Sequence, residues 1–161
     1  MTKKWVNTAV AAGKLGNPAN IMPGKQYSFA IAFEVAAADA DGDVYYLAQL
    51  AANAIPLSLK LNCDAIAGAT SYDMGLYRMD GTVKDKDCFM AATDINAGAA
   101  IGSEIECLSA IGVDAIGAKK VYEFAGDSLA SKDEAYILAI TANTVGTAAG
   151  TIAVRGTFIQ G

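Results

Sequence analysis

The chain has 161 residues and a mass of 16.5 kDa, close to one average domain, so a second domain of similar size is excluded. Its net charge of −5 at pH 7 argues against nucleic acid as a partner, because proteins that hold phosphates usually carry a basic face. Histidine is absent, which excludes Ser-His and Cys-His catalysis and every metal site that depends on imidazole.

The composition is typical of a subunit in an assembly. Hydrophobic residues make up 53% of the chain and charged residues 18%, against about 25% charged residues in an ordinary soluble domain. Because charged residues are depleted at the centres of protein interfaces, a surface poor in charge is easier to cover with another protein. The alternative is an ordinary monomer whose many alanines raise the hydrophobic count.

The N-terminal stretch lacks a periodic pattern, because glycines and prolines interrupt it. We therefore expect an extended arm in residues 1–24 and one domain in residues 25–161. Residues 1–33 contain four lysines and no acidic residue, whereas the remainder is net acidic. The arm is expected to contact a neighbouring subunit, the alternative being a terminus with no role. Its candidate contact residues are Lys3, Lys4, Trp5, Val6 and Lys14.

The first strand of the domain is predicted from Gln26 onward. Large apolar side chains there alternate with small or polar ones, and this period of two marks a strand with one buried face. The residues predicted to face the core are Tyr27, Phe29, Ile31, Phe33 and Val35.

Three further strands are predicted in the first half of the chain. Residues 43–50 follow a turn-rich stretch, and residues 55–62 and 72–76 alternate in the same way. The last of these strands runs up to an Asp80-Gly81 turn.

The middle of the chain is less regular. Residues 84–94 are predicted as a short helix or a loop, residues 101–111 as a weak strand and residues 118–124 as another strand. Alternation returns in residues 134–142 and 150–159, which are predicted as the last two strands.

These elements predict an all-β fold. Seven or eight strands are separated by turns, and no long amphipathic helix lies between them. Parallel sheets need crossover helices, so the sheets should be largely antiparallel. The predicted fold is an antiparallel β-sandwich or jelly roll with an extended N-terminal arm.

Two pairs of acidic residues have a spacing that could direct both carboxylates to one sugar or metal ion. Asp85 and Asp87, and Glu104 and Glu106, lie two residues apart, so each pair shares one face of a strand. Acid-base catalysis also needs one carboxyl group with a raised pKa, which apolar surroundings supply and these polar stretches do not. A solvated acidic face is the favoured interpretation of both pairs.

The turn with Asp39, Asp41 and Asp43 resembles the opening of a calcium-binding loop. It departs from the complete pattern, because the sixth position holds Val44 where glycine is expected and the twelfth holds Leu50 where glutamate is expected. A hairpin loop explains the acidic turn more simply, and the sequence leaves open whether it binds a cation.

Cysteines and tyrosines are interpreted as structural. The three cysteines, Cys63, Cys88 and Cys107, are odd in number and lack CxxC spacing, which is typical of reduced, buried thiols. Tyrosines that alternate on strands favour packing over a sugar-binding platform. We therefore expect no enzymatic activity, no cofactor and no metal site.

Membrane insertion and secretion are not expected. The chain has no run of 18 apolar residues, and its first residues lack the uninterrupted apolar stretch of a signal peptide. We expect the protein to stay in the cytoplasm of the cell that makes it.

Three segments resemble the small virion proteins of tailed bacteriophages. They are GDVYYLAQLAANAIPLSLKLNCDAI (42–66), YDMGLYRMDGTVKDKDCFMAATDI (72–95) and AYILAITANTVGTAAGTIAVRGTFI (135–159). The resemblance is to β-rich head decoration proteins, also called cement proteins, and it covers about two-thirds of the chain.

This resemblance implies a protein on the capsid exterior that bridges neighbouring major capsid subunits. It further implies a homo-oligomer, with a trimer favoured and a dimer possible, and no catalytic residues. The alternatives are another virion component, such as a tail or baseplate adaptor or a head fibre, and a carbohydrate-binding β-sandwich.

Overall fold

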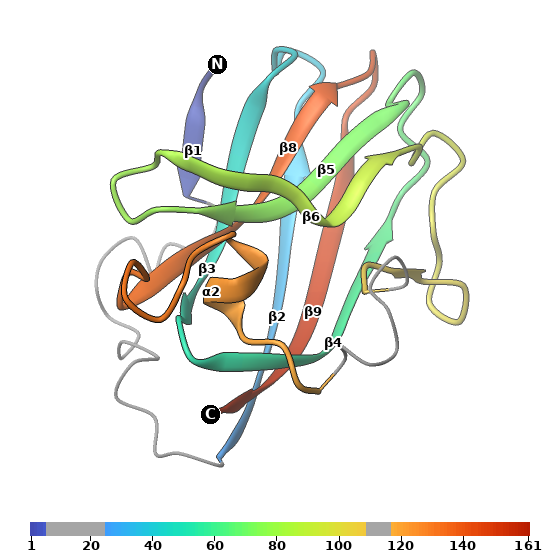
Figure 1. Cartoon of the computed structure of the whole chain (residues 1–161). Coiled ribbons are helices and arrows are strands. Elements are labelled where there is room, and N and C mark those ends of the chain that lie inside the picture. Colours follow the sequence, from blue (N-terminus) through green and yellow to red (C-terminus); the bar gives the residue numbers. More distant parts are fainter. Residues whose placement is uncertain (6–24, 109–116) are drawn as a thin grey trace.

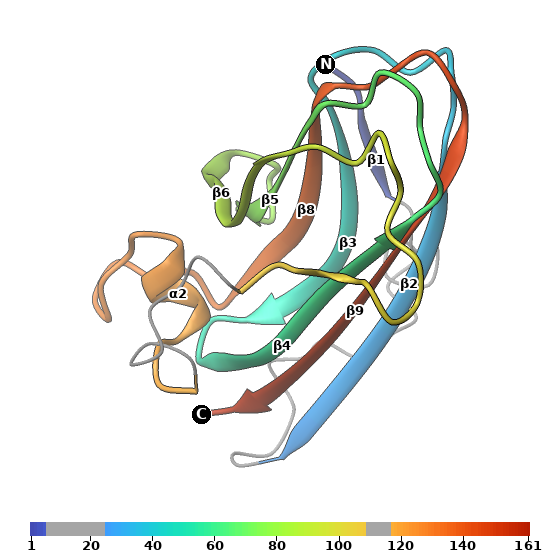
Figure 2. The same cartoon turned by 90° about the vertical axis from the view of Figure 1, so that its right-hand side faces the viewer.

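The computed structural model describes residues 1–5, 25–108 and 117–161. Most of the predicted arm, with Val6 and Lys14, and the end of the predicted strand at residues 101–111 lie outside the described residues. In the described part, the chain is a sandwich of two β-sheets that face each other (Figures 1 and 2). The predicted all-β sandwich is thus confirmed.

Nine strands and one short helix are present in the described ranges. The first sheet has the strand order β1 (Lys3–Trp5), β3 (Asp43–Ala51), β8 (Ala135–Thr144), β5 (Ser71–Tyr77) and β6 (Val83–Thr93). The second sheet has the order β2 (Gln26–Val35), β9 (Gly150–Gln160), β4 (Ala54–Cys63) and β7 (Ile105–Glu106). The helix is α2 (Val121–Phe124). Every described strand pair is antiparallel except β1 with β3, which is parallel.

The second sheet has one buried and one open face. Along β2 the residues predicted to face inward do so, since Ile31, Phe33 and Val35 are buried and the two aromatic residues before them pack against the core. The outward residues of β2 are exposed. This alternation is the physical basis of the period of two in the sequence.

The central strands of the first sheet are buried on both faces. Tyr136, Leu138 and Ile140 of β8 belong to the main core, whereas Ile137 and Ala139 belong to a second apolar cluster on the outer face. The second cluster is completed by Val44, Tyr46 and Tyr77. Burial on both faces explains why residues 135–142 are almost continuously apolar.

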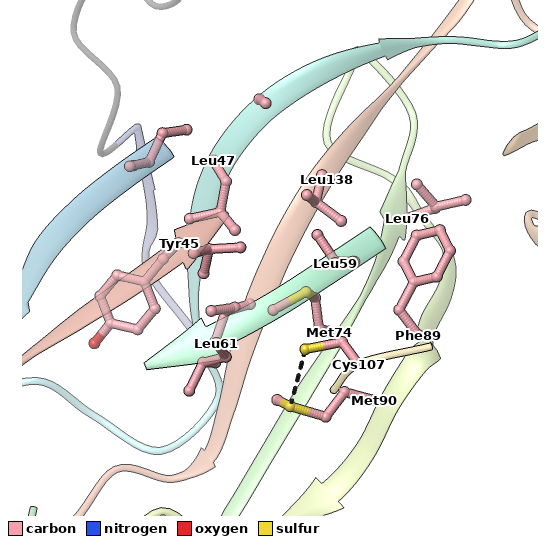
Figure 3. Close-up of a cluster of buried hydrophobic side chains, with 14 of the residues drawn as sticks. Tyr45, Leu47, Leu59, Leu61, Met74, Leu76, Phe89, Met90, Cys107 and Leu138 are labelled. Atoms are coloured by element: carbon pink, nitrogen blue, oxygen red, sulfur yellow. Dashed lines mark hydrogen bonds between the residues drawn. The ribbon is translucent and has the colours of Figure 1, made fainter. Parts of the chain in front are cut away.

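The main core joins the two sheets by direct contact. The ring of Phe33 on β2 lies 4.9 Å from the ring of Tyr45 on β3, measured between centroids. Figure 3 shows Leu59 and Leu61 of β4 close to Leu47 and Leu138 of the first sheet. Since these leucines are fully buried, they contribute to the hydrophobic stabilisation of the sandwich.

The prediction of a short helix or a loop for residues 84–94 is wrong, because most of these residues lie in strand β6. The pairing with β5 is irregular: Met74 pairs with Met90, yet Leu76 pairs with Asp85. More residues of β6 than of β5 fall between these two pairs, so β6 bulges. The bulge hides the period of two, which is why the strand is not visible in the sequence.

The prediction of a strand in residues 118–124 is wrong, because residues 118–120 lie in a turn and residues 121–124 form helix α2. Val121 and Phe124 are buried and lie three residues apart, which is the spacing of one helix face. The carboxylate of Glu123 accepts a hydrogen bond of 2.7 Å from the backbone N–H of Lys120 and closes the first turn. In the described part of the range 101–111, only the two residues of β7 are strand.

The β6 bulge covers part of the outer face of the first sheet. Gly75 faces outward on β5, between Asp73 and Tyr77, and a Cβ at this position would lie 2.1 Å from the carbonyl oxygen of Asp85. The backbone of β6 therefore rests directly on Gly75. A glycine is needed here because any side chain would occupy the space of that backbone.

Asp73 holds the same bulge in place. Its carboxylate is almost fully buried and accepts hydrogen bonds from the Ala92 backbone N–H (2.7 Å) and the Asn143 side chain (2.7 Å). It also pairs with the ammonium of Lys86 at 2.9 Å. Ala92 has a left-handed backbone with φ of 45°, an unusual conformation for alanine that this hydrogen bond supports.

Candidate interaction surfaces

The N-terminal residues are docked on the edge of the first sheet. The Val44 backbone N–H donates to the Thr2 carbonyl (2.8 Å), and the Thr2 N–H donates to the Asp43 carboxylate (2.6 Å). Figure 1 shows β1 alongside β3 at this edge. Two parallel neighbouring strands cannot be joined by a tight turn and need a long connection. The chain meets this requirement, since residues 6–24 alone separate Trp5 from the described start of the domain.

Two lysines add polar contacts to this docked segment. The Lys4 ammonium pairs with the carboxylates of Asp39 and, at 3.5 Å, Asp43. The Lys3 ammonium donates a hydrogen bond to the Gly81 carbonyl in the β5–β6 turn. We call Asp39, Asp43, Val44 and Gly81 the docking site, since these four residues bind the segment.

The predicted contact residues are thus distributed as follows. Lys3 and Lys4 contact the docking site of their own chain, and the backbone of Trp5 pairs with Tyr46. The predicted role of these residues in binding a neighbouring subunit stays a prediction. The acceptor side, above all Asp39 and Asp43, is missing from the predicted set of contact residues, because no sequence signal links a turn to a distant lysine.

The docking site is electrostatically tuned for a basic segment. Burial tends to raise the pKa of Asp39, but hydrogen bonds from Lys4, Tyr45 and the Ala36 N–H outweigh it and hold the pKa below the ordinary value of 3.8. Burial also tends to raise the pKa of Asp43. Hydrogen bonds from the N–H groups of Thr2 and Ala40 and the charge of Lys4 outweigh burial and lower this pKa. The hydrogen bond to Asp39 raises the pKa of Lys4 above 10.5.

These pKa shifts predict that docking of β1 depends on pH. Lowered carboxyl pKa values stabilise the docked state above about pH 3.8, and this contribution is lost as the pH falls through the folded-state values. The raised pKa of Lys4 stabilises docking below about pH 10.5, and this contribution is lost as the pH rises further. The protection factor of the Val44 amide in hydrogen exchange should therefore be highest between these limits. An unchanged protection factor at pH 3 would contradict the assignment.

The acidic turn at Asp39, Asp41 and Asp43 has protein partners for all three carboxylates. Asp39 and Asp43 bind Lys4, and Asp41 accepts a hydrogen bond of 2.9 Å from the Val145 N–H. Within residues 1–5, 25–108 and 117–161, no three acidic or cysteine side chains converge on one point that suits a metal. The turn thus fastens the N-terminal segment and the β8–β9 connection.

The two carboxylate pairs have different surroundings. Glu104 forms an ion pair of 2.6 Å with Arg155, while Glu106 accepts a hydrogen bond from the Leu108 N–H. Burial raises the pKa of Asp85, and the neighbouring Asp87 carboxyl adds to this effect. Asp85 lies on the β6 bulge, whose backbone contacts Gly75.

Cysteines and tyrosines contribute mainly to packing. Cys107 is buried, and its thiol lies 4.0 Å from the Met90 sulfur (Figure 3); burial raises the pKa of this thiol to about 12. All three cysteines are free. Tyr45, Tyr72 and Tyr136 are among the largest fully buried side chains, which supports the packing interpretation.

The outer face of the second sheet is an open surface on which rows of small residues flank one basic row. In register across β2, β9 and β4, Ala32 lies beside Ala153, and Ala153 beside Asn62. The next row on the same face, Ala30, Arg155 and Lys60, contains two basic side chains, and the row beyond it consists of Ser28, Thr157 and Ser58. The small side chains of the outer two rows let another protein surface approach the sheet closely, while Arg155 and Lys60 offer polar contacts between them. We call it the small-residue face.

This face contains a shallow hollow of about 230 Å³ that extends across β2, β9 and β4. It is lined mainly by Ala30, Ala32, Asn62, Ile101, Ala153 and Arg155. Ile101 is 86% exposed, which is unusual for so large an apolar side chain. A protein partner on this face would cover Ile101.

The comparisons with known proteins concern the fold. No protein-family model and no curated protein matches the sequence. The structure is similar to a chain in the solved capsid of Ralstonia phage GP4, with a TM-score of 0.64 and 16% identity over 99% of both chains. A chain in the capsid asymmetric unit of cyanophage Pam1 gives a TM-score of 0.43 and 16% identity, over 94% of this chain and 96% of that one.

The similarity to the GP4 capsid chain shows a shared fold over nearly the whole length. As to membranes, no helix in the described residues has the length and apolar character required to cross a bilayer.

Proposed function

We propose that the protein is a structural component of a bacteriophage virion, where it decorates the outside of the capsid and bridges neighbouring major capsid subunits. The observation that carries this proposal is the end-to-end similarity of its fold to a chain of a phage capsid. The resemblance of three sequence segments to phage decoration proteins supports the same function independently.

Two surfaces support a bridging role. The small-residue face offers an open sheet for contact with a capsid subunit, and the arm expected in residues 1–24 would add a second contact. Many repeated weak contacts of this kind add up across a lattice by multivalency. The protein would be made in the host cytoplasm and join the shell as a homo-oligomer, for which we favour a trimer over a dimer.

Binding to empty capsids tests the proposal. We expect the full chain to co-sediment with empty shells of its own phage until the sites are saturated. Deletion of residues 1–24 should leave the domain folded, as judged by circular dichroism, but raise the Kd for capsids by about tenfold, the effect of losing about 1.4 kcal/mol of binding free energy. An unchanged Kd would remove the arm from the account.

A second variant tests the small-residue face in the same assay. Ala153→Arg adds a further charge and a long side chain in the row of small residues beside Arg155 and should also raise the Kd for capsids by about tenfold or more. The matched control is Ala130→Arg, the same change at an exposed loop position outside the face, which should bind as the full chain does.

A further inference from the structure

The docked N-terminal segment behaves as a ligand of the rest of the molecule. All its described partners, namely the carboxylates of Asp39 and Asp43, the Val44 N–H and the Gly81 carbonyl, belong to the domain. None of these contacts depends on which copy of the chain supplies residues 2–5.

Charge complementarity makes the site selective for this segment. Lys3 and Lys4 lie in a stretch of 33 residues with no acidic side chain, and their acceptor site contains two carboxylates. Asp43 is 3% exposed and Asp39 is 12% exposed at the side chain, so these charges are only weakly screened by solvent. The site thus fits a segment with the polarity of this chain's own N-terminus.

The connection to the domain is long enough to reach another copy. Residues 6–24 could span at most about 65 Å when fully extended. On a shell, where copies lie side by side, the effective concentration of a neighbour's segment rises to the millimolar range typical of tethered ligands.

We propose that the docking site accepts residues 2–5 of a second copy of this chain, so that neighbouring copies exchange their N-terminal strands. Exchange keeps every contact of the docked strand and therefore has no cost in hydrogen bonds or ion pairs. This inference deepens the proposed bridging function, and the biological role of the exchange rests on that proposed function. The exchange itself requires no capsid.

A labelled peptide tests whether the site accepts a segment in trans. The receptor is the full chain with Lys3→Glu and Lys4→Glu, whose own segment is repelled while its docking site is unchanged. The fluorescent peptide MTKKWVNT should bind this receptor saturably in an anisotropy titration. The same peptide with Lys3→Glu and Lys4→Glu should bind at least tenfold more weakly. Equal affinity of the two peptides, or no binding, would overturn the proposal.

A mixing experiment tests exchange between whole chains. Chains with Lys3→Glu and Lys4→Glu keep an intact site, whereas chains with Asp39→Asn keep an intact segment. Native mass spectrometry should show heterodimers in the mixture and far fewer dimers of either variant alone. Thermal melting first confirms that both variants fold; if Asp39→Asn does not, Asp43→Asn takes its place, because the Asp43 carboxylate accepts the Thr2 N–H and pairs with Lys4.

The outcomes separate this inference from the proposed function. Peptide binding without heterodimers would overturn strand exchange, because the site would then serve only its own chain. Neither experiment contains a capsid, so failure of exchange leaves capsid binding untouched. Exchange by a protein that ignores capsids would instead contradict the proposed function alone.

Discussion

Replacing Gly75 with alanine is expected to destabilise the protein by about 3 kcal/mol or more, among the largest effects of a single methyl group. The added Cβ would lie 2.1 Å from the Asp85 carbonyl oxygen and 2.4 Å from the Lys86 carbonyl carbon. Both are backbone atoms, so no side-chain rotation relieves the overlap, and β6 must move off β5. For a domain of this size the melting temperature should fall by roughly 10 °C.

Gly42→Ala is the matched control. Gly42 has a φ of 86°, but no atom lies within 4 Å of a Cβ at that position. The control therefore measures the cost of a left-handed alanine alone, about 1 kcal/mol. If Gly75→Ala costs no more than Gly42→Ala, the backbone of β6 does not rest on Gly75.

Replacing Asp73 with asparagine is expected to destabilise the protein by about 3 kcal/mol. Asparagine keeps the shape but loses the charge, and its amide group brings a donor to a site where Ala92, Asn143 and Lys86 all donate. One of these donors must then lose its buried acceptor. Chemical denaturation of both proteins at pH 7 measures the difference.

The destabilisation caused by Asp73→Asn should depend on pH. Burial tends to raise the pKa of Asp73, but hydrogen bonds from Ala92, Asn143 and Lys86 outweigh this effect and hold the pKa below 3.8. Its contribution is therefore complete above about pH 3.8 and disappears as the pH falls through the folded-state value. Asp64→Asn is the control, because Asp64 is exposed and accepts a hydrogen bond from the Thr151 N–H. Equal destabilisation by the two variants would contradict the role of Asp73.

These two predictions bear on function through the faces of the sandwich. If β6 is fastened on the first sheet by Gly75 and Asp73, that part of the outer face is already covered within the chain. The small-residue face of the second sheet is then the larger open sheet surface in the described residues. This difference is why we place the capsid contact on the second sheet.

Most strands could be predicted because each has at least one buried face. The alternation in β2 and β9 follows directly from the burial of every second residue. The alternation fails where tertiary contacts replace it: the β6 bulge is set by Gly75 and Asp73 on another strand, and α2 has only four residues. Such short or irregular elements leave no periodic signal.

The two partners of the docked contact can each be recognised in the sequence, but their association cannot. The basic character of the arm is a property of the sequence itself, and the acidic turn at Asp39–Asp43 is equally plain. Their association is not, because Lys4 and Asp39 lie 35 residues apart and nothing local joins them. Only the parallel pairing of β1 with β3 brings these charges together.

The most direct test of the account is a reconstruction of intact phage particles from electron micrographs. We predict density for this two-sheet domain on the outside of the shell, in contact with at least two major capsid subunits at each position. Density for the domain in the tail or baseplate, or particles that lack the chain altogether, would contradict the proposed function.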